Sequence, residues 1–325
     1  MNKNKKNAIG IDLGGTKMLT ALIDKNHKIS SKVKEKTKVE KGEKYFLETL
    51  LDSVQQLLDE AGLKARDLAG IGIGVPGVVD GRQGMVISAP NVAFMQDYPL
   101  GAKLKKLLGI PVVLENDVNA GLYGEYRFGA AKGHRHVVGI FIGTGIGGAL
   151  ILNGELYRGT SGAAGELGHM FVDAFGPKCG CGKTGCLEAL AGRMAIASEA
   201  AVLAAKQQAP HLFDLAGTSV SEIKSGVLAK SIRLGDRAIR DLVQSKARLV
   251  GGVAANIVNL LNPDLIVLGG GVVEALPDLI VKEVRDALKE HAMEPLAKKV
   301  DVVVSKLGDD SVVQGAAQLA REAED

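Results

Sequence analysis

The chain contains one arrangement twice: an apolar strand, a short turn of glycine and threonine, and a second apolar strand. The first copy spans residues 8–23 around the turn 14–17, and the second spans residues 137–152 around the turn 143–148. Glycine allows the tight turns that such hairpins need. We therefore expect two related halves, each beginning with a hairpin that has a glycine-rich tip.

Between and after the hairpins, apolar strands alternate with helical patterns. Residues 46–58 carry apolar side chains at helical spacing and end at Gly62, and the strand 70–75 follows. Later segments repeat this alternation, with a helix over 236–261, a strand over 264–268 and a final helix over 311–322. Strands that alternate with helices predict α/β architecture.

Composition excludes several classes of protein. The 325 residues suffice for two domains or one large domain, and 46% of them are hydrophobic. The net charge of +3, from 40 basic and 37 acidic residues, is too balanced to indicate nucleic acid or a membrane surface as partner. The uncharged stretch 138–153 is too short and glycine-rich to span a bilayer, and no signal peptide is visible. We expect a cytoplasmic protein.

All three cysteines lie within eight residues, after a histidine. His169, Cys179, Cys181 and Cys186 are soft ligands on a glycine-rich loop, which suits tetrahedral zinc. The alternatives are a disulfide, which would leave one cysteine over, or inert buried thiols. Four protein ligands leave no open position for a substrate, so a bound zinc would be structural. The nearby residues 182–184 (GKT) match the end of the phosphate-binding P-loop motif. However, Pro177 occupies the position where that motif needs its first glycine, so we reject a P-loop.

The first glycine turn can contact phosphate. Glycine backbone N–H groups beside threonine and lysine donors can bind phosphate oxygens. Asp12 could hold a metal-bound water, because Mg²⁺ prefers carboxylate and water oxygens. An ordinary hairpin turn is the alternative. The residues of this site are Asp12, Gly14, Gly15, Thr16 and Lys17.

Two further glycine turns follow strands. The turn 143–148 fits the dinucleotide motif G-x-G-x-x-G by letter, but a strand follows it where that motif needs a helix, so we interpret it as a second phosphate-contacting turn. The turn 269–271 could admit the flat face of a nucleoside, or could simply join a strand to a helix. The residues concerned are Gly143, Thr144 and Gly145, and Gly269, Gly270 and Gly271.

Polar residues at a strand end form another candidate site. Asn116 and Asp117 follow the strand 112–114, and ligand sites of α/β folds gather at the carboxyl ends of strands. A carboxylate there can orient a hydroxyl nucleophile and accept its proton. Asp117 could instead cap the helix expected at 119–128, because aspartate is a good N-cap.

Three polar residues accompany the cysteine cluster. Glu166, His169 and Glu188 could together hydrogen-bond several hydroxyl groups of a polyol. The glutamates could instead be solvent-facing charges, and His169 could serve only as a zinc ligand. Its two roles are compatible, because the ring nitrogen that does not bind metal can face a substrate.

Together these motifs resemble the ROK family of sugar kinases, and within it most closely the bacterial glucokinases. The similarity extends from Asp12 to about Gly315 and covers nearly the whole chain. The matching segments, in order, are DLGGTK at 12–17, GVPG at 74–77, END at 115–117, IGTGIGG at 142–148, GELGH at 165–169 and CGCGKTGCLE at 179–188.

The resemblance implies an actin-like ATPase (ribonuclease H-like) fold with two α/β lobes and a cleft between them. The N-terminal lobe would hold residues 1–122 and 306–325, and the C-terminal lobe residues 123–305. It also implies ATP-dependent phosphorylation of a hexose, with Mg²⁺ and a structural Zn²⁺, in a homodimer or homotetramer. Glucose is the expected hexose, because the motifs are closest to those of glucokinases.

The resemblance also implies roles for individual residues. Asp117 would be the base, the turns at Asp12 and Gly143 would meet the ATP phosphates, and the glycines 269–271 would lie near adenosine. The sugar would be held by Gly77, Asn116, Asp117, Glu166, His169 and Glu188. His169, Cys179, Cys181 and Cys186 would bind zinc.

Other members of the family define the alternatives. Fructose, mannose, N-acetylmannosamine and N-acetylglucosamine kinases differ in the loops around the sugar. Sugar-responsive repressors carry a DNA-binding helix-turn-helix before the sugar-binding part, and only seven residues precede the first strand here. A non-catalytic sugar-binding protein would leave the combination of the Asp12 turn with Asp117 unexplained.

Overall fold

The computed structural model describes residues 6–89, 92 and 94–323, and it consists of two compact units. The first unit comprises residues 1–133, 156–164 and 309–325, as far as they are described. The second unit comprises residues 134–155 and 165–308. The chain therefore leaves the second unit at residue 156, joins the first for nine residues, and returns at residue 165.

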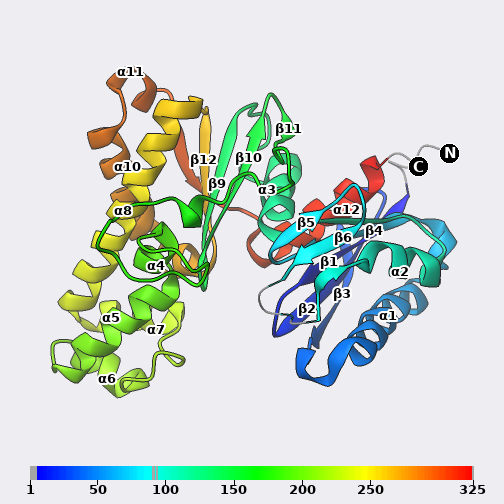
Figure 1. Ribbon diagram of the computed structural model, residues 1–325, viewed down its shortest axis with the longest axis horizontal. Coiled ribbons are helices and arrows are strands. Elements are labelled where there is room, and N and C mark those ends of the chain that lie inside the picture. Colours follow the sequence, from blue (N-terminus) through cyan, green and yellow to red (C-terminus); the bar gives the residue numbers. More distant parts are fainter. Residues whose placement is uncertain (1–5, 90–91, 93, 324–325) are drawn as a thin grey trace. The chain divides into compact units, whose positions relative to one another are not determined.

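A five-stranded sheet forms the centre of the first unit (Figure 1). Its strand order is β3-β2-β1-β4-β8, where β1 pairs antiparallel with β2 and parallel with β4. The lysine-rich β3 lies at an edge of the sheet and ends at Lys36. The strands are β1 (Asn7–Leu13), β2 (Lys17–Ile23), β3 (Ile29–Lys36), β4 (Leu68–Val75) and β8 (Val112–Asn116).

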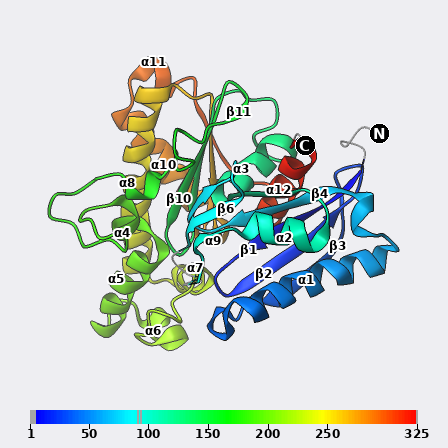
Figure 2. The same ribbon diagram turned by 45° about the vertical axis from the view of Figure 1, so that its right-hand side comes forward.

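Helices cover both faces of this sheet. Because side chains alternate along a strand, Ile9 and Ile11 face the core that they share with α1 (Gly42–Ala61) and α2 (Leu100–Leu108). Ala8 instead faces α12 (Ser311–Glu322), which lies beside α3 (Asp117–Phe128). Figure 2 shows α1 and α2 on one side of the sheet and α12 on the other.

Glycines let α12 approach the sheet and α3 unusually closely. A methyl group on Gly10 would lie 1.8 Å from the carbonyl oxygen of Val313, and one on Gly315 would lie 1.8 Å from that of Ala120. Since no side chain fits at such distances, glycine is required for this backbone-to-backbone packing. The C-terminal helix is thereby locked between β1 and α3.

A small antiparallel sheet, β5-β6-β7, also belongs to the first unit. It consists of β5 (Val78–Asp80), β6 (Met85–Ser88) and β7 (Gln96–Tyr98). The sequence pattern predicts no strands in this stretch after Pro76-Gly77. The sheet's three- and four-residue strands are too short for periodicity to reveal them.

The second unit repeats the topology of the first. Its sheet order is β11-β10-β9-β12-β13, with β9 antiparallel to β10 and parallel to β12, which matches the first sheet position by position. The two related halves expected from the sequence are therefore confirmed. The strands are β9 (Val137–Ile142), β10 (Ile146–Leu152), β11 (Glu155–Leu156), β12 (Leu265–Gly269) and β13 (Asp301–Val304).

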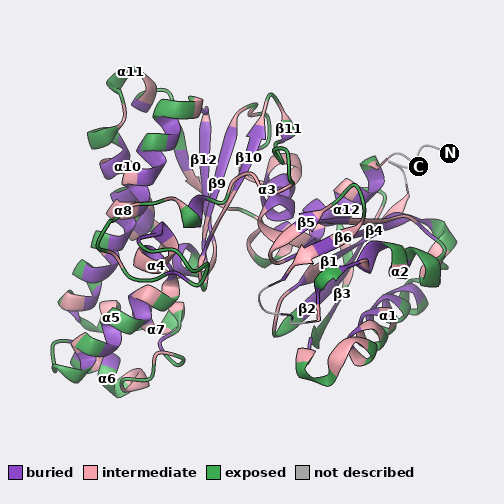
Figure 3. Ribbon diagram, viewed as in Figure 1, coloured by how far each residue is buried: buried purple, intermediate pink, exposed green. Residues whose placement is uncertain are grey.

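Helices pack on this sheet through one continuous apolar core. Val138 and Ile140 of β9 belong to the same buried cluster as Val253 and Ile257 of α8 (Arg237–Leu261), which also packs on α10 (Pro277–His291). Figure 3 shows buried residues along β9 and β12. The remaining helices are α4 (Leu187–Ala191), α5 (Arg193–Ala205), α6 (Pro210–Ala216), α7 (Ser225–Leu234), α9 (Gly271–Ala275) and α11 (Glu294–Ala297).

The boundary between the units differs from the expected one. A division after residue 122 would cut α3, which packs closely on α12. A methyl group on Gly124 of α3 would lie 2.2 Å from the Ser311 carbonyl oxygen of α12. The whole helix therefore stays in the first unit, and the division falls after Gly133. Residues 156–164 also belong to that unit, for which the local sequence carries no signal. The outermost residues of the expected first lobe, 1–5 and 324–325, lie outside the described residues.

None of the helices in the described part of the chain has the length and apolar character needed to cross a bilayer.

Candidate active site

The first glycine turn connects β1 to β2 and is held by hydrogen bonds at its base. Gly14 N–H donates to the Lys17 carbonyl oxygen at 2.9 Å, and the Thr37 hydroxyl donates to the Gly14 carbonyl oxygen at 2.8 Å. Thr16 and Lys17 remain exposed at the tip. The turn therefore has a rigid frame and presents a hydroxyl and an ammonium group to solvent.

Asp12 and Asp117 meet on the α12 face of the first sheet. Asp12 is paired with Gly74 across β1 and β4, and a methyl group on Gly74 would lie 3.3 Å from the Cα atom of Asp117. The pKa of Asp12 is raised to about 7, mainly by burial and further by the charges of Asp117 and Asp309, while the charge of Lys34 acts in the opposite direction. This crowding of carboxylates favours binding of a cation.

The residues after β8 have separate roles. Asn116 caps α3, because its side-chain oxygen accepts a hydrogen bond from Asn119 N–H at 3.0 Å. Its side-chain amide donates to the Gly77 carbonyl oxygen at 3.0 Å. Asp117 is the first residue of the helix and accepts from Val118 N–H at 2.9 Å. The alternative interpretation of Asp117 as the N-cap is therefore wrong.

The second glycine turn lies at the corresponding place in the second unit. Gly143 N–H donates to the Gly145 carbonyl oxygen at 2.9 Å and closes the turn. Arg193, at the start of α5, donates its backbone N–H to the Gly143 carbonyl oxygen at 3.1 Å and its guanidinium to the Thr144 hydroxyl, also at 3.1 Å. Arg193 could not be predicted from the sequence, because no local motif marks a partner 49 residues away.

The third glycine turn adjoins the second. Gly269 lies opposite Phe141 in the parallel pairing of β9 and β12. Gly270 has a φ of 86°, and a methyl group there would lie 2.7 Å from the Ile142 carbonyl group. The close approach and the positive φ both require glycine. The sheet register thus brings the turns 143–145 and 269–271 to the same edge.

Glu188 joins the second turn to the cysteine loop. Its Oε2 accepts the Ile146 N–H at 2.9 Å, and a methyl group on Gly145 would lie 1.9 Å from the same oxygen. Its Oε1 lies 3.8 Å from Cys179 Sγ. One carboxylate therefore contacts both the turn and a candidate metal ligand.

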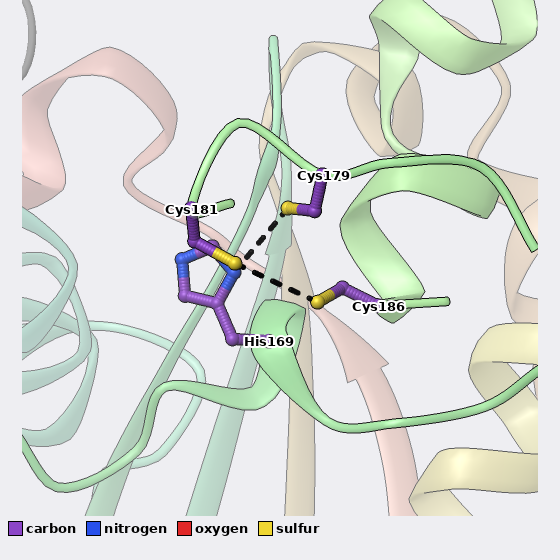
Figure 4. A group of neighbouring side chains, drawn as sticks. All are labelled: His169, Cys179, Cys181 and Cys186. Atoms are coloured by element: carbon purple, nitrogen blue, oxygen red, sulfur yellow. Dashed lines mark hydrogen bonds between the residues drawn. The ribbon is translucent and has the colours of Figure 1, made fainter. Parts of the chain in front are cut away.

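The candidate metal ligands converge as the sequence predicts. One ligand atom from each of His169, Cys179, Cys181 and Cys186 lies within 4.8 Å of the others (Figure 4). The sulfur atoms of Cys181 and Cys186 are 3.7 Å apart, which fits two thiolates on one tetrahedral zinc with Zn–S bonds of about 2.3 Å. A disulfide would need about 2.05 Å, so these cysteines are free thiols.

The two ring nitrogens of His169 lie near different groups. Nδ1 lies 3.7 Å from Cys179 Sγ, and Nε2 lies 3.9 Å from Oε2 of Glu166. Glu166 and His169 are both exposed. Nδ1 can therefore serve the metal while Nε2 and the neighbouring carboxylate face outward.

The expected site residues thus form two groups. The first unit brings together Asp12, the turn 14–17, Gly77, Asn116 and Asp117, and the second unit brings together the turns 143–145 and 269–271, Glu166, Glu188 and the metal ligands. Asp309, which acts on the pKa of Asp12, is a further residue that the sequence analysis missed. A hollow of about 490 Å³ in the second unit, lined by α7, α8 and residues 275–282, includes none of these residues.

Two α/β units with the same strand order, each with a glycine turn in its first hairpin, define the actin-like ATPase fold with two lobes. The chain belongs to the ROK family, whose sequence model matches residues 8–323. The family and the fold predicted from the motifs are therefore confirmed.

Individual relatives are similar over nearly the whole chain. The glucokinase of Thermotoga maritima is 35% identical over 322 residues, 98% of each chain. A structure described as a ROK family glucokinase from Streptomyces griseus in complex with glucose and AMPPNP aligns with a TM-score of 0.84 and 33% identity, over 98% of this chain and 100% of that one. A putative xylose repressor of Caldicellulosiruptor sp. is 32% identical, over 98% of this chain and 79% of that protein.

Proposed function

We propose that this protein transfers the terminal phosphoryl group of ATP to glucose and forms glucose 6-phosphate. The observation that carries the proposal is the pair Asp12 and Asp117, which joins a phosphate-type glycine turn to a carboxylate at the start of a helix. The similar glucokinase of Thermotoga maritima and the Streptomyces griseus structure, whose description names glucose and AMPPNP, support the choice of substrates.

In this proposal, the first unit supplies the base. Asp117 orients the attacking sugar hydroxyl and accepts its proton, while Asn116 and the Gly77 backbone contact the sugar. The turn from Gly14 to Lys17 contacts phosphate oxygens through backbone N–H, hydroxyl and ammonium groups. Phosphoryl transfer depends on this positioning and on neutralised charge more than on strong base chemistry.

Mg²⁺ fits the carboxylates of the first unit. Asp12 would hold it, directly or through water. The pKa of Asp12 is raised by burial and, to a smaller extent, by the charges of Asp117 and Asp309, and a cation would relieve the repulsion among these carboxylates. The ion would neutralise charge on the phosphate oxygens of ATP.

The second unit supplies sugar, nucleotide and metal contacts. Glu166, His169 and Glu188 would hold sugar hydroxyls, and the turns at Gly143 and 269–271 would contact phosphate and adenosine. The cluster His169, Cys179, Cys181 and Cys186 would bind a structural Zn²⁺, since all four tetrahedral positions come from the protein.

The test is ATP-dependent phosphorylation of glucose, fructose, mannose, N-acetylglucosamine and N-acetylmannosamine. We expect glucose to dominate, and Asp117→Ala to remove nearly all turnover while sugar binding changes only modestly. The exposed Asp52→Ala on α1 is the matched control and should retain full activity. Near-normal turnover by Asp117→Ala would overturn the assignment of the base. A different dominant sugar would make the protein another hexose kinase.

A sugar-responsive regulator is the second candidate, because the similar proteins include a putative xylose repressor. It predicts sugar binding, measured by calorimetry, without turnover of any sugar by the wild-type protein. Dominant glucose phosphorylation would exclude a purely regulatory role.

The resemblance also supports a homodimer or homotetramer. Light scattering coupled to size-exclusion chromatography measures the mass of the assembly directly.

A further inference from the structure

Residues 156–164 form a docked segment of the first unit, inserted between two stretches of the second. Arg158 Nε donates to Glu115 Oε2 at 2.6 Å. Gly162 gives a second attachment point, because a methyl group there would lie 2.6 Å from the Val79 carbonyl oxygen, and its φ is 82°. The segment therefore binds its unit through one ion pair and one close backbone contact.

The carboxylate that Arg158 meets is almost fully buried. The side chain of Glu115 is 7% exposed, against 44% for Arg158. Its other oxygen, Oε1, accepts the Asn116 N–H at 3.0 Å and the Asn119 side-chain amide at 2.9 Å. Both oxygens of this buried anion thus have partners, and in the described part of the chain Arg158 is the cation that pairs with it.

These partners of Glu115 belong to the start of α3. Asn116 caps the helix through Asn119 N–H, and Asp117 is the next residue along the chain. The contacts therefore connect Arg158, through Glu115, to the Asn116 backbone before the proposed base and to the Asn119 side chain after it. The side-chain oxygen of Asn119 is buried and has no hydrogen-bond partner among the described residues. The Asn119 side-chain amide is therefore oriented by its hydrogen bond to Glu115.

We propose that Arg158 is a positioning residue for the proposed sugar phosphorylation and acts through Glu115 on Asn116 and Asp117. A buried carboxylate without its cation carries an uncompensated charge, which is relieved by a shift of the side chain or by admitting water. Either change weakens the hydrogen bonds that Oε1 accepts. The helix start then loosens, and Asp117 loses its alignment with the attacking hydroxyl. This inference rests on the proposed function of Asp117.

The test combines Arg158→Met with Glu115→Gln. Arg158→Met removes the cation and keeps much of the side-chain volume. We expect kcat to fall about tenfold to hundredfold and the KM for glucose to rise, while the KM for ATP stays within twofold. Glutamine at 115 keeps an acceptor oxygen without a charge, so the double variant should recover most of the lost kcat. Arg66→Met, at an exposed arginine on the same unit, is the matched control and should match wild type.

The outcomes separate positioning from general stability. A lowered melting temperature with unchanged kcat and glucose KM would show that the pair is purely structural. A kcat loss that the double variant does not recover would also overturn the proposal. If Arg158→Met does not fold, the double variant alone decides, because a folded but inactive double variant contradicts the inference.

A failure of the proposed function can be distinguished from a failure of the Arg158 inference. If the wild-type protein phosphorylates no hexose, that function fails, and the Arg158 inference is then judged by amide hydrogen exchange. The Asn119 N–H, bonded to the Asn116 cap, should exchange faster in Arg158→Met and recover in the double variant. Unchanged exchange would reject the coupling between Arg158 and α3.

Discussion

The Ile146 N–H donates a hydrogen bond to Oε2 of Glu188 at 2.9 Å, and this contact ties the second glycine turn to the helix behind the cysteine loop. The other oxygen of the same carboxylate lies 3.8 Å from Cys179 Sγ. A structural metal on this loop would therefore affect more than the proposed sugar contacts. It would also support the backbone that we expect to contact ATP.

The first prediction separates the hydrogen bond of Glu188 from its charge. Glu188→Ala leaves the buried Ile146 N–H without a partner, at a cost of about 1–3 kcal/mol, and we expect the KM for ATP to rise about tenfold. Glu188→Gln retains an acceptor oxygen and should keep the ATP KM near wild type while still weakening glucose binding. Steady-state kinetics with each substrate varied in turn checks both. Equal ATP KM values in the two variants would show that the hydrogen bond does not support the turn.

The second prediction concerns metal removal. Chelation of the wild-type protein, or Cys181→Ser, should remove zinc and weaken glucose and ATP binding together, because Glu188 contacts both the loop and the turn. Metal content by mass spectrometry and the two KM values are the measurements. Lys183→Ser, on the same exposed loop but outside the ligand set, is the control. A zinc-free protein with unchanged KM values would show that the metal does not shape the site.

The third prediction follows from the raised pKa of Asp12. A carboxyl group whose pKa rises on folding to about 7 adds stability below its unfolded pKa of 3.8, and that stability is lost as the pH rises through about 7. Asp12→Asn should therefore match wild type near about pH 4 and melt at a higher temperature than wild type above about pH 8, in metal-free buffer. Thermal unfolding across this range measures the difference. Asp52→Asn, at an exposed position, should show no such trend.

The fourth prediction tests the close packing of α12. Gly315→Ala places a methyl group 1.8 Å from the Ala120 carbonyl oxygen, so we expect a loss of about 2–3 kcal/mol in the free energy of unfolding. Gly252→Ala lies inside α8 with no atom within 4 Å of the added methyl group, and it should stabilise the protein by about 0.5–1 kcal/mol. Urea denaturation compares the two. Equal effects would mean that α12 can shift away from α3 without cost.

Much of the fold could be predicted because its signals are local. Each hairpin shows its two apolar strands and glycine turn within about twenty residues, and α1 and α8 show helical periodicity along their length. The four metal ligands fall within 18 residues, so the loop itself brings them together. The sequence pattern does not predict the short helices α6 and α7, because their seven and ten residues give too little periodicity to recognise.

The sequence by itself determined the family and the duplicated hairpins, and it supplied the residues of the proposed site. Only the tertiary structure decided that Asn116 caps α3 in place of Asp117, that Asp309 acts on Asp12, and that Arg158 pairs with a glutamate 43 residues away. The physical reason is the separation along the chain of the residues that interact. Turn formation and side-chain periodicity are properties of neighbouring residues, whereas these contacts depend on sheet register and on which face of a strand or helix each residue occupies.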